Sequence, residues 1–412
     1  MRGKKKKMSQ AMAFIVLFGV VSLFSDMTHE GASSIRGAYL ALLGASAGTI
    51  GFISGLGELV GYSMRYVFGR LTDKSKRYWP MTVVGYVLDV LAVPALALVG
   101  EHGWIWACAL LVIQRMGKAI KKPAKDTIMS FAASQEGVGK SFGIQEVLDQ
   151  LGAFLGPVLL YVVMLKTDGT TLRVYAACFA VLAIPGAITL ILLLVTRRKF
   201  PNPEHFEPEP REYVPFHMKK EFLLYIGGIS LFAFGFIDYS VIIMHVSRTF
   251  TGVAAGPQET GSLISGGTLP LLYAGAMLVD AVAALFFGLL YDRKGVRALV
   301  WSTLLSAPFA IFVFAGHSVA SLLVGIALWG VGMGAQESIL KAAVSSMVPK
   351  TSRATGYGVF ECAFGVFWFF GSWLLGVLYD RSIPAMIVVS VAAQLAAIPL
   401  YIASSRRIKA NP

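Results

Sequence analysis

Acidic side chains occur inside long apolar stretches of this sequence, where a charge is costly. These carboxylates are Asp26, Glu58, Asp89, Glu146, Asp149, Asp238, Asp280, Glu337 and Glu361. A carboxylate that is kept from water without a full partner favours its neutral form and can take up a proton near neutral pH. The basic residues expected at comparable depth are fewer, namely Arg65, Arg115, Lys118 and Lys341. This pattern predicts reversible protonation, which coupling to a proton gradient requires.

Three polar residues near position 146 are spaced to share one helix face. Glu146, Asp149 and Gln150 stand at i, i+3 and i+4. Arg115 lies in another apolar stretch, where an arginine is costly unless it is paired or faces a cavity. We therefore expect Arg115 to pair with Glu146 or Asp149. Such a pair could be structural or could couple movement to protons, and the residues alone leave both open.

Two short patterns that suggest other chemistry are interpreted as structural. Asp26, His29 and Glu30 could bind a cation, but a cluster at a helix end is more often a solvated mouth, so no metal site is predicted. The segment GVGKS at 137–141 resembles the end of a phosphate-binding loop, but Ser134 replaces its leading glycine and a helix precedes it. No Ser/His/Asp or Cys/His constellation occurs in the short loops. The sequence predicts neither an enzyme nor a cofactor.

The elements that position these groups follow from composition. Of the 412 residues, 56% are hydrophobic and 14% charged, and the mean hydropathy is +0.67. A chain this apolar must lie in lipid. It divides into about twelve stretches of ~20 residues, the length that crosses a bilayer as a helix. Strand-like alternation is absent, so we predict an all-α membrane protein rather than a barrel.

Basic residues give the predicted orientation. The 36 Lys and Arg give a formal charge of +13, and nearly all fall at one set of helix ends, which argues against nucleic-acid binding. The expected outer loops keep only Arg36, Lys166, Arg173, Arg248 and Arg381. We therefore expect a multi-pass protein of the cell membrane with both termini cytoplasmic. Residues 1–25 lack a signal-peptide cleavage site and are interpreted as a retained first helix. The three cysteines lie in apolar helices, so no disulfide is predicted.

The expected spans form two halves of six helices. They cover 11–29, 39–68, 80–99, 104–128, 142–165 and 173–195, then 221–247, 263–288, 298–316, 319–347, 354–379 and 384–403. The predicted domains are 1–196 and 221–412. The Pro-rich, charged segment 197–220 is interpreted as a cytoplasmic linker.

The two halves repeat a loop pattern that carries a family resemblance. GRLTDKSKR follows the second helix, and GLLYDRKGVR follows the eighth. Both resemble the G-x-L-x-D-[RK]-x-G-x-[RK] signature of the major facilitator superfamily. The second copy is nearly complete, whereas the first has Lys76 where the second glycine is expected. The resemblance implies twelve helices in two pseudo-symmetric six-helix bundles, with a substrate site between them.

The same resemblance implies a cytoplasmic gate that latches the outward-facing state. A glycine lets two helices approach, and an aspartate can face the positive end of a neighbouring helix. The predicted gate residues are Gly69, Asp73, Arg77, Asp126, Gly288, Asp292, Arg293 and Arg297. A shorter segment, GVLYDR at Gly376–Arg381, resembles GLLYDR at Gly288–Arg293 but lies at the opposite end of its half. It either marks an inverted repeat or arises by chance.

Further resemblances bear on mechanism. GAFLGP at Gly152–Pro157 matches part of a helix-5 pattern in the family's antiporters, through Gly152, Gly156 and Pro157. QRMGKA at Gln114–Ala119, in the fourth helix, loosely resembles the family's R-x-x-x-G motif. In this family helices 1, 4, 7 and 10 line the cavity. The predicted residues for proton coupling and the substrate cavity are Asp26, Glu58, Arg115, Glu146, Asp149, Asp238, Glu337 and Glu361.

These features predict a monomeric, proton-coupled transporter that moves a small organic solute by alternating access. Antiport and export are preferred because of Gly152–Pro157. The acid-rich interior would suit a lipophilic or cationic substrate. The alternatives are a proton symporter that imports a nutrient and a non-transporting sensor with the same fold.

Overall fold

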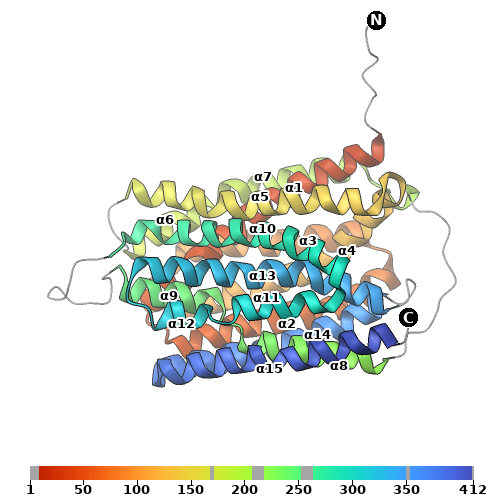
Figure 1. Ribbon diagram of the computed structural model, residues 1–412. Helices are drawn as coiled ribbons and strands as arrows, with labels where there is room; N and C mark the ends of the chain where they lie inside the picture. Colours follow the sequence, from red (N-terminus) through yellow and green to blue (C-terminus); the bar gives the residue numbers. More distant parts are fainter. Residues whose placement is uncertain (1–8, 168–170, 207–217, 252–262, 349–352, 411–412) are drawn as a thin grey trace, which may run out of the picture.

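The computed structural model describes residues 9–167, 171–206, 218–251, 263–348 and 353–410, where the regular elements are helices (Figure 1). A few side chains within these ranges, including those of Asp73 and Lys341, lie outside the description. The first elements are α1 (Gln10–Leu42), α2 (Ala47–Ser75), α3 (Tyr78–Ala95), η1 (Leu96–Leu98), α4 (Trp104–Glu136), α5 (Val138–Leu165), α6 (Leu172–Val181), α7 (Ala183–Lys199) and η2 (Pro203–Phe206). The others are α8 (Lys220–Gly235), α9 (Tyr239–Thr249), η3 (Gly266–Thr268), α10 (Leu269–Lys294), η4 (Gly295–Arg297), α11 (Ala298–Ser306), α12 (Phe309–Phe314), α13 (Val319–Met347), α14 (Arg353–Arg381) and α15 (Ile383–Ala410).

Length and hydropathy identify nine candidate membrane spans in the described chain. One of them, Gly266–Phe314, holds two passes, because α10 runs parallel to α13 whereas α11 and α12 run antiparallel to it. The more polar α2 and α4 lie antiparallel to spans: α2 along α14, and α4 along α3. These helices together account for twelve passes. The predicted all-helical membrane fold is confirmed.

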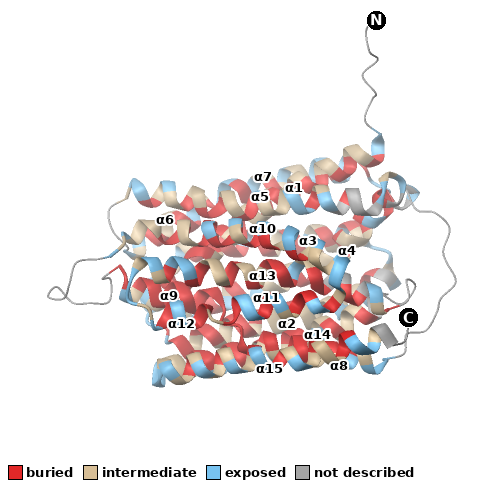
Figure 2. Cartoon of the chain, viewed as in Figure 1, coloured by how far each residue is buried: buried red, intermediate tan, exposed pale blue. Residues whose placement is uncertain are grey.

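The helices have two distinct ends. Gln10, Ala410 and the flanks of the α7–α8 connection lie at one end, here called the termini end (Figure 1). The α1–α2 and α14–α15 turns lie at the other, here called the loop end. Buried residues follow the inward faces of the helices (Figure 2). Outward faces carry large apolar side chains such as Leu98, Trp106 and Leu285, as a lipid-facing surface requires.

Helices α1–α7, here the first half, pack mainly on one another, and so do α8–α15, the second half. The most extensive contacts between the halves are those of α2 with α14, α1 with α9, and α5 with α10. The predicted linker 197–220 begins within α7, and its residues 207–217 lie outside the described chain. The domain boundaries therefore stay a prediction.

Three predicted helices are interrupted. The stretch 173–195 is divided into α6 and α7, 221–247 into α8 and α9, and 298–316 into α11 and α12. Pro308 lacks a backbone N–H and stands at the last of these breaks. Asp238 stands at the second, where its Oδ1 accepts a 2.8 Å hydrogen bond from the Ser240 backbone N–H at the start of α9. The break thus places a buried polar helix start at the contact between the two halves.

The first helix is longer than predicted, which corrects the placement of Arg36. The sequence pattern ended this helix at residue 29 and put Arg36 in an outer loop, but α1 continues to Leu42. Arg36 is 8% exposed and contacts the start of α9. It belongs to the buried charges between the halves.

Candidate functional site

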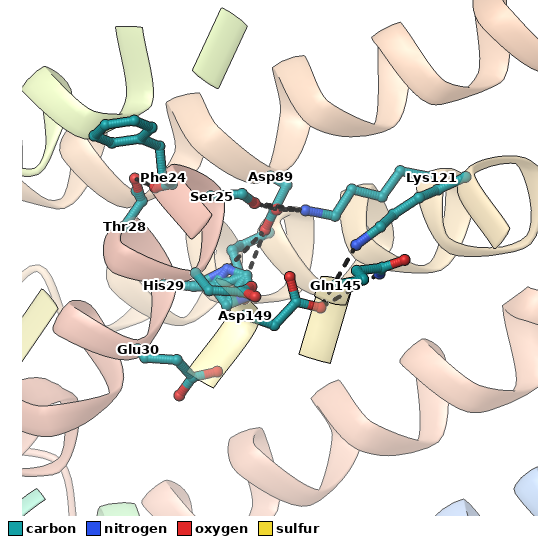
Figure 3. Close-up of polar contacts among 12 residues, drawn as sticks. Phe24, Ser25, Thr28, His29, Glu30, Asp89, Lys121, Gln145 and Asp149 are labelled. Atoms are coloured by element: carbon teal, nitrogen blue, oxygen red, sulfur yellow. Dashed lines mark hydrogen bonds and ion pairs between the residues drawn. The ribbon is translucent and has the colours of Figure 1, made fainter. Parts of the chain in front are cut away.

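Asp89 is the centre of a buried polar network within the first half (Figure 3). The Lys121 ammonium donates to Asp89 Oδ2 and, at 2.8 Å, to Ser25 Oγ. The Gln114 side-chain amide donates to Asp89 Oδ1 at 2.8 Å, and His29 Nδ1 lies 3.4 Å from that oxygen. Asp89 is 1% exposed. Helices α1, α3 and α4 thus surround one carboxylate with cationic and neutral donors.

Two glycines explain why this network forms. A Cβ on Gly117 of α4 would lie 2.5 Å from the Asp89 amide nitrogen, and one on Gly85 of α3 would lie 2.5 Å from that of Lys121. Only glycine permits such backbone contact between two helices. The contact brings Asp89 and Lys121 together, and the Lys121 ammonium also lies 4.1 Å from the Tyr86 ring centroid.

The network extends from Asp89 toward α5. His29 Nε2 lies 3.6 Å from Asp26 Oδ1, and Lys125 Nζ lies 3.9 Å from Asp149 Oδ2. Gln145 donates to the same Asp149 oxygen at 3.3 Å. Figure 3 shows the Asp149 carboxylate turned toward this group, whereas Glu30 points away. The predicted coupling residues Asp26 and Asp149, whose side chains are 23% and 22% exposed, therefore lie at the edge of this buried network.

The helix-5 pattern has a packing role in this chain. A Cβ on Gly152 would meet the Leu23 carbonyl oxygen at 2.3 Å, and one on Gly156 would meet that of Met27 at 2.3 Å. Both contacts lie between α5 and α1, which run parallel. Pro157 follows inside α5. The two glycines hold Asp26 and Asp149 on adjoining helix faces.

Arg115 does not pair with Glu146 or Asp149, which corrects the predicted contact. Its guanidinium lies 2.6 Å from Glu58 Oε1. Gly57 explains this pairing, because a Cβ there would lie 2.9 Å from the Arg115 side chain, so Arg115 lies along α2 rather than α5. The pair stays within the first half.

Several polar side-chain contacts cross between the halves. Arg36 donates to Ser240 Oγ at 2.8 and 3.0 Å and lies 3.6 Å from Asp238 Oδ1. Arg65 lies 3.2 Å from Glu361 Oε1. The Tyr273 hydroxyl donates to Glu30 Oε2 at 2.5 Å. A cavity of about 10 Å³ beside Arg36, Ser54 and Arg115, lined also by Ile53 and Leu111, has room for about one water molecule. The halves are therefore closed against each other around Arg36.

The remaining predicted acids lie in the second half or face it. Asp280 of α10 is 2% exposed, and Gln150 of α5 donates to its Oδ2 at 3.5 Å. Gln150 donates to Glu146 Oε1 at the same distance. Glu337 lies on α13, whose Gly334 contacts the Asp280 backbone. These groups gather where α5 meets α10.

The predicted gate residues are not brought into one latch in the described chain. Asp126 lies 3.5 Å from Lys122 on its own helix, and Arg77 precedes α3. Asp292, Arg293 and Arg297 are exposed around η4. The two signature glycines lie near other helices, Gly69 near Pro123 and Gly288 near Ser338. Because the Asp73 side chain lies outside the description, the latch stays a prediction. Lys76, in place of the signature's second glycine, adopts the left-handed conformation with φ of 51°.

The cluster of Asp26, His29 and Glu30 does not converge on one point, although His29 stays 3.6 Å from Asp26. His29 faces Asp89, and Glu30 accepts from Tyr273 in the second half. Among the described residues, no group of three or more His, Cys, Asp or Glu side chains could hold a metal ion.

Comparison with known proteins connects this arrangement to a family. The sequence profile of the Major Facilitator Superfamily matches residues 8–257 and 239–412. The chain belongs to this superfamily. It is therefore a secondary transporter of a solute rather than an enzyme, and a multi-pass membrane protein.

Relatives of this transporter extend over nearly its whole length. An uncharacterised protein of Mycobacterium tuberculosis is 37% identical over 407 residues, which covers 97% of this chain and 95% of the relative. An uncharacterised MFS-type transporter of Methanocaldococcus jannaschii is 26% identical and covers 89% of each chain.

Solved structures share the transporter's fold. A nucleoside transporter matches with a TM-score of 0.69 at 14% identity, covering 97% of this chain and 99% of that one. A bacterial homologue of the lysosomal transporter Spinster, solved facing inward, also has a TM-score of 0.69, with 13% identity and 98% coverage of both chains. A D-xylose–proton symporter matches at 0.67 and 13% identity, over 94% and 96%. At these identities the likeness concerns the fold alone.

Sequence reasoning missed the central network. It counted Asp89 among the buried acids but gave it no role, and it did not place Lys121 or Lys125 at membrane depth. The helical spacing of Gln114, Lys118, Lys121 and Lys125 on α4, at intervals of three and four, was the available signal. A basic face of this kind on a buried helix requires acids on its neighbours.

Proposed function

We propose that this transporter is a proton-coupled antiporter that exports a small organic solute. One observation carries the proposal, namely the group of neighbouring titratable side chains within the first half. Asp89, Lys121, His29 and Lys125 are buried, and Asp26 and Asp149 are partly buried beside them. Buried ionisable residues in membrane helices commonly form proton pathways. The termini end would be the cytoplasmic end, as the distribution of basic residues predicts.

The contacts between halves suggest how protonation would act on alternating access. Arg36 and Asp238 belong to different halves and meet toward the loop end. Opening that end requires the two residues to separate. A proton on Asp238 would remove the attraction to the Arg36 guanidinium and so favour opening. Release of the proton would restore the attraction and favour closure, which links proton binding to the exposure of the solute site.

The direction of transport is inferred from two glycines of α5. Gly152 and Gly156 resemble part of the antiporter pattern, and here they bring α5 against α1 beside Asp26 and Asp149. The competing proposal is a proton symporter that imports a nutrient. A growth assay separates the two, because expression of an exporter should raise tolerance to a toxic solute, whereas expression of an importer should raise uptake. A thermal-shift screen of the purified protein would identify the solute, since ligand binding stabilises the folded state.

Replacing Asp149 with asparagine should weaken the proton coupling. Proteoliposomes with an imposed pH gradient and an internal pH dye would report proton flux on addition of solutes from a broad panel. We expect Asp149→Asn to lower solute-driven flux about tenfold or more, since a change of ~1.4 kcal/mol in an activation barrier alters a rate tenfold. The control is Glu101→Gln, an exposed acid at the loop end, which should behave as the parent. Proton flux absent for every solute, or unchanged in Asp149→Asn, would refute coupling through this group.

A further inference from the structure

The start of α2 is held by a residue of the other half. Asp380, near the end of α14, accepts hydrogen bonds from the backbone N–H groups of Ala47 at 3.1 Å and Gly48 at 2.7 Å. Each of its two carboxylate oxygens takes one bond. A carboxylate at a helix N-terminus also meets the positive end of the helix dipole. One charged side chain therefore connects the second half to the first at the loop end.

The first turn of α2 depends on this residue for its hydrogen bonds. The first N–H groups of a helix have no partner within the helix itself. Ser46 caps α2 by accepting from the Thr49 N–H at 3.1 Å, and the Ile50 N–H reaches the Ser46 carbonyl at 3.0 Å. The two groups before them, on Ala47 and Gly48, are satisfied by Asp380. If the halves separated, these two N–H groups would have to hydrogen-bond with water instead.

The two helices touch along their backbones beside this contact. A Cβ on Gly51 would lie 2.2 Å from the Ser372 carbonyl oxygen, and one on Gly376 would lie 2.4 Å from that of Ala47. This close approach sets the position of Asp380 over the end of α2. The contact can therefore form only when α2 and α14 are together at the loop end.

Solvent reaches the carboxylate from one side. Asp380 borders an open groove of about 570 Å³ whose lining also includes Thr49, Trp104 and Trp373. Water can replace the carboxylate at the two N–H groups as the helices part. An interaction that water can replace contributes a modest free energy, which suits a contact that forms and breaks in every transport cycle.

We propose that Asp380 is the latch of the loop-end gate and stabilises the conformation in which that end is closed. The sequence around it, GVLYDR at Gly376–Arg381, repeats GLLYDR at Gly288–Arg293, the signature loop at the termini end. The same short pattern thus stands at both ends of the second half, and at the loop end its aspartate caps a helix of the first half. This latch requires alternating access but not proton coupling. A failure of the proposed coupling therefore leaves the latch proposal unaffected, and the reverse also holds.

Spin-label distances between the halves would test the latch. The labels would be placed at Lys166 and His317, two exposed loop-end positions in different halves, as Lys166→Cys and His317→Cys. Cys362 is exposed and would be changed to serine, whereas Cys108 and Cys178 are buried. In lipid nanodiscs, Asp380→Ala should raise the ratio of open to closed loop ends about fivefold, which corresponds to about 1 kcal/mol, the usual contribution of a helix cap. Asp380→Asn, which keeps an acceptor oxygen, should shift it less.

A control variant and the conservative substitution of Asp380 make the outcome decisive. Glu101→Gln removes an exposed loop-end acid for which the described chain shows no hydrogen bond or ion pair, and it should leave the distances unchanged. Asp380→Asn preserves the size of the side chain and serves as the test if Asp380→Ala fails to fold. A parental distance distribution in the folded Asp380 variants would overturn the proposal. So would an equal shift in Glu101→Gln, because the effect would then come from surface charge in general.

Discussion

Lys121→Met is expected to abolish transport and to lower the free energy of unfolding by about 3–5 kcal/mol, the usual cost of breaking a buried ion pair on one side. The reason is the location of Asp89, which is 1% exposed and would be left as a buried carboxyl group without its cationic partner. Gln114 and His29 would still contact the carboxylate, but neither supplies the fixed positive charge of a lysine. Thermal unfolding of the purified protein and solute flux in proteoliposomes would measure the two effects.

A second substitution separates stability from function. Asp89→Asn combined with Lys121→Met removes both charges, so much of the stability should return, whereas transport should stay at background if the pair carries protons. Lys122→Met is the matched control, because Lys122 is the next residue, is 32% exposed and lies 3.5 Å from Asp126. Its loss should change stability by less than ~1 kcal/mol. Parental stability of Lys121→Met would show that Asp89 does not depend on this lysine.

The fold was largely predictable because lipid imposes a simple rule on the backbone. Apolar stretches long enough to cross the bilayer must be helices, and their number and punctuation follow from the sequence. Even α2 and α4, too polar to meet a strict hydropathy criterion, were predicted among the stretches long and apolar enough to cross. The ends of the helices were harder to predict. Gly44, with φ of 94°, and the cap Ser46 mark where α1 gives way to α2, and attention to them would have placed Arg36 inside the helix.

The polar network was less predictable because helix pairing decides it. The sequence placed Arg115 at membrane depth but not beside a particular neighbour, so α5 was chosen where the structure has α2. Asp89 and Lys121 meet because Gly85 and Gly117 allow α3 and α4 to touch. A glycine in an apolar helix does not by itself reveal which helix it faces. Residue type predicted which groups are costly to bury, whereas close backbone contacts determined their partners.

Gly37→Ala is expected to reduce transport strongly by disfavouring closure of the loop end. A Cβ at this position of α1 would lie 1.8 Å from the Ser240 carbonyl oxygen and 2.8 Å from the Ile243 side chain. No helix geometry accommodates the first distance, so α1 and α9 must separate. Separation would break the hydrogen bonds from Arg36 to Ser240 and weaken its attraction to Asp238. Overpacking of this kind costs about 1–3 kcal/mol, and here the cost falls on the closed conformation alone.

The same substitution at an open position is the control. Gly275 on α10 is exposed, and a Cβ there would meet nothing within 4 Å, so Gly275→Ala should transport as the parent does. The spin-label pair at Lys166 and His317 would show Gly37→Ala shifted to the open loop end. A Gly37→Ala protein that folds and transports at the parental rate would mean that the contact between α1 and α9 is not needed for the cycle. The ion pair of Arg36 and Asp238 would then lose its proposed role as well, because both depend on the same approach of the two helices.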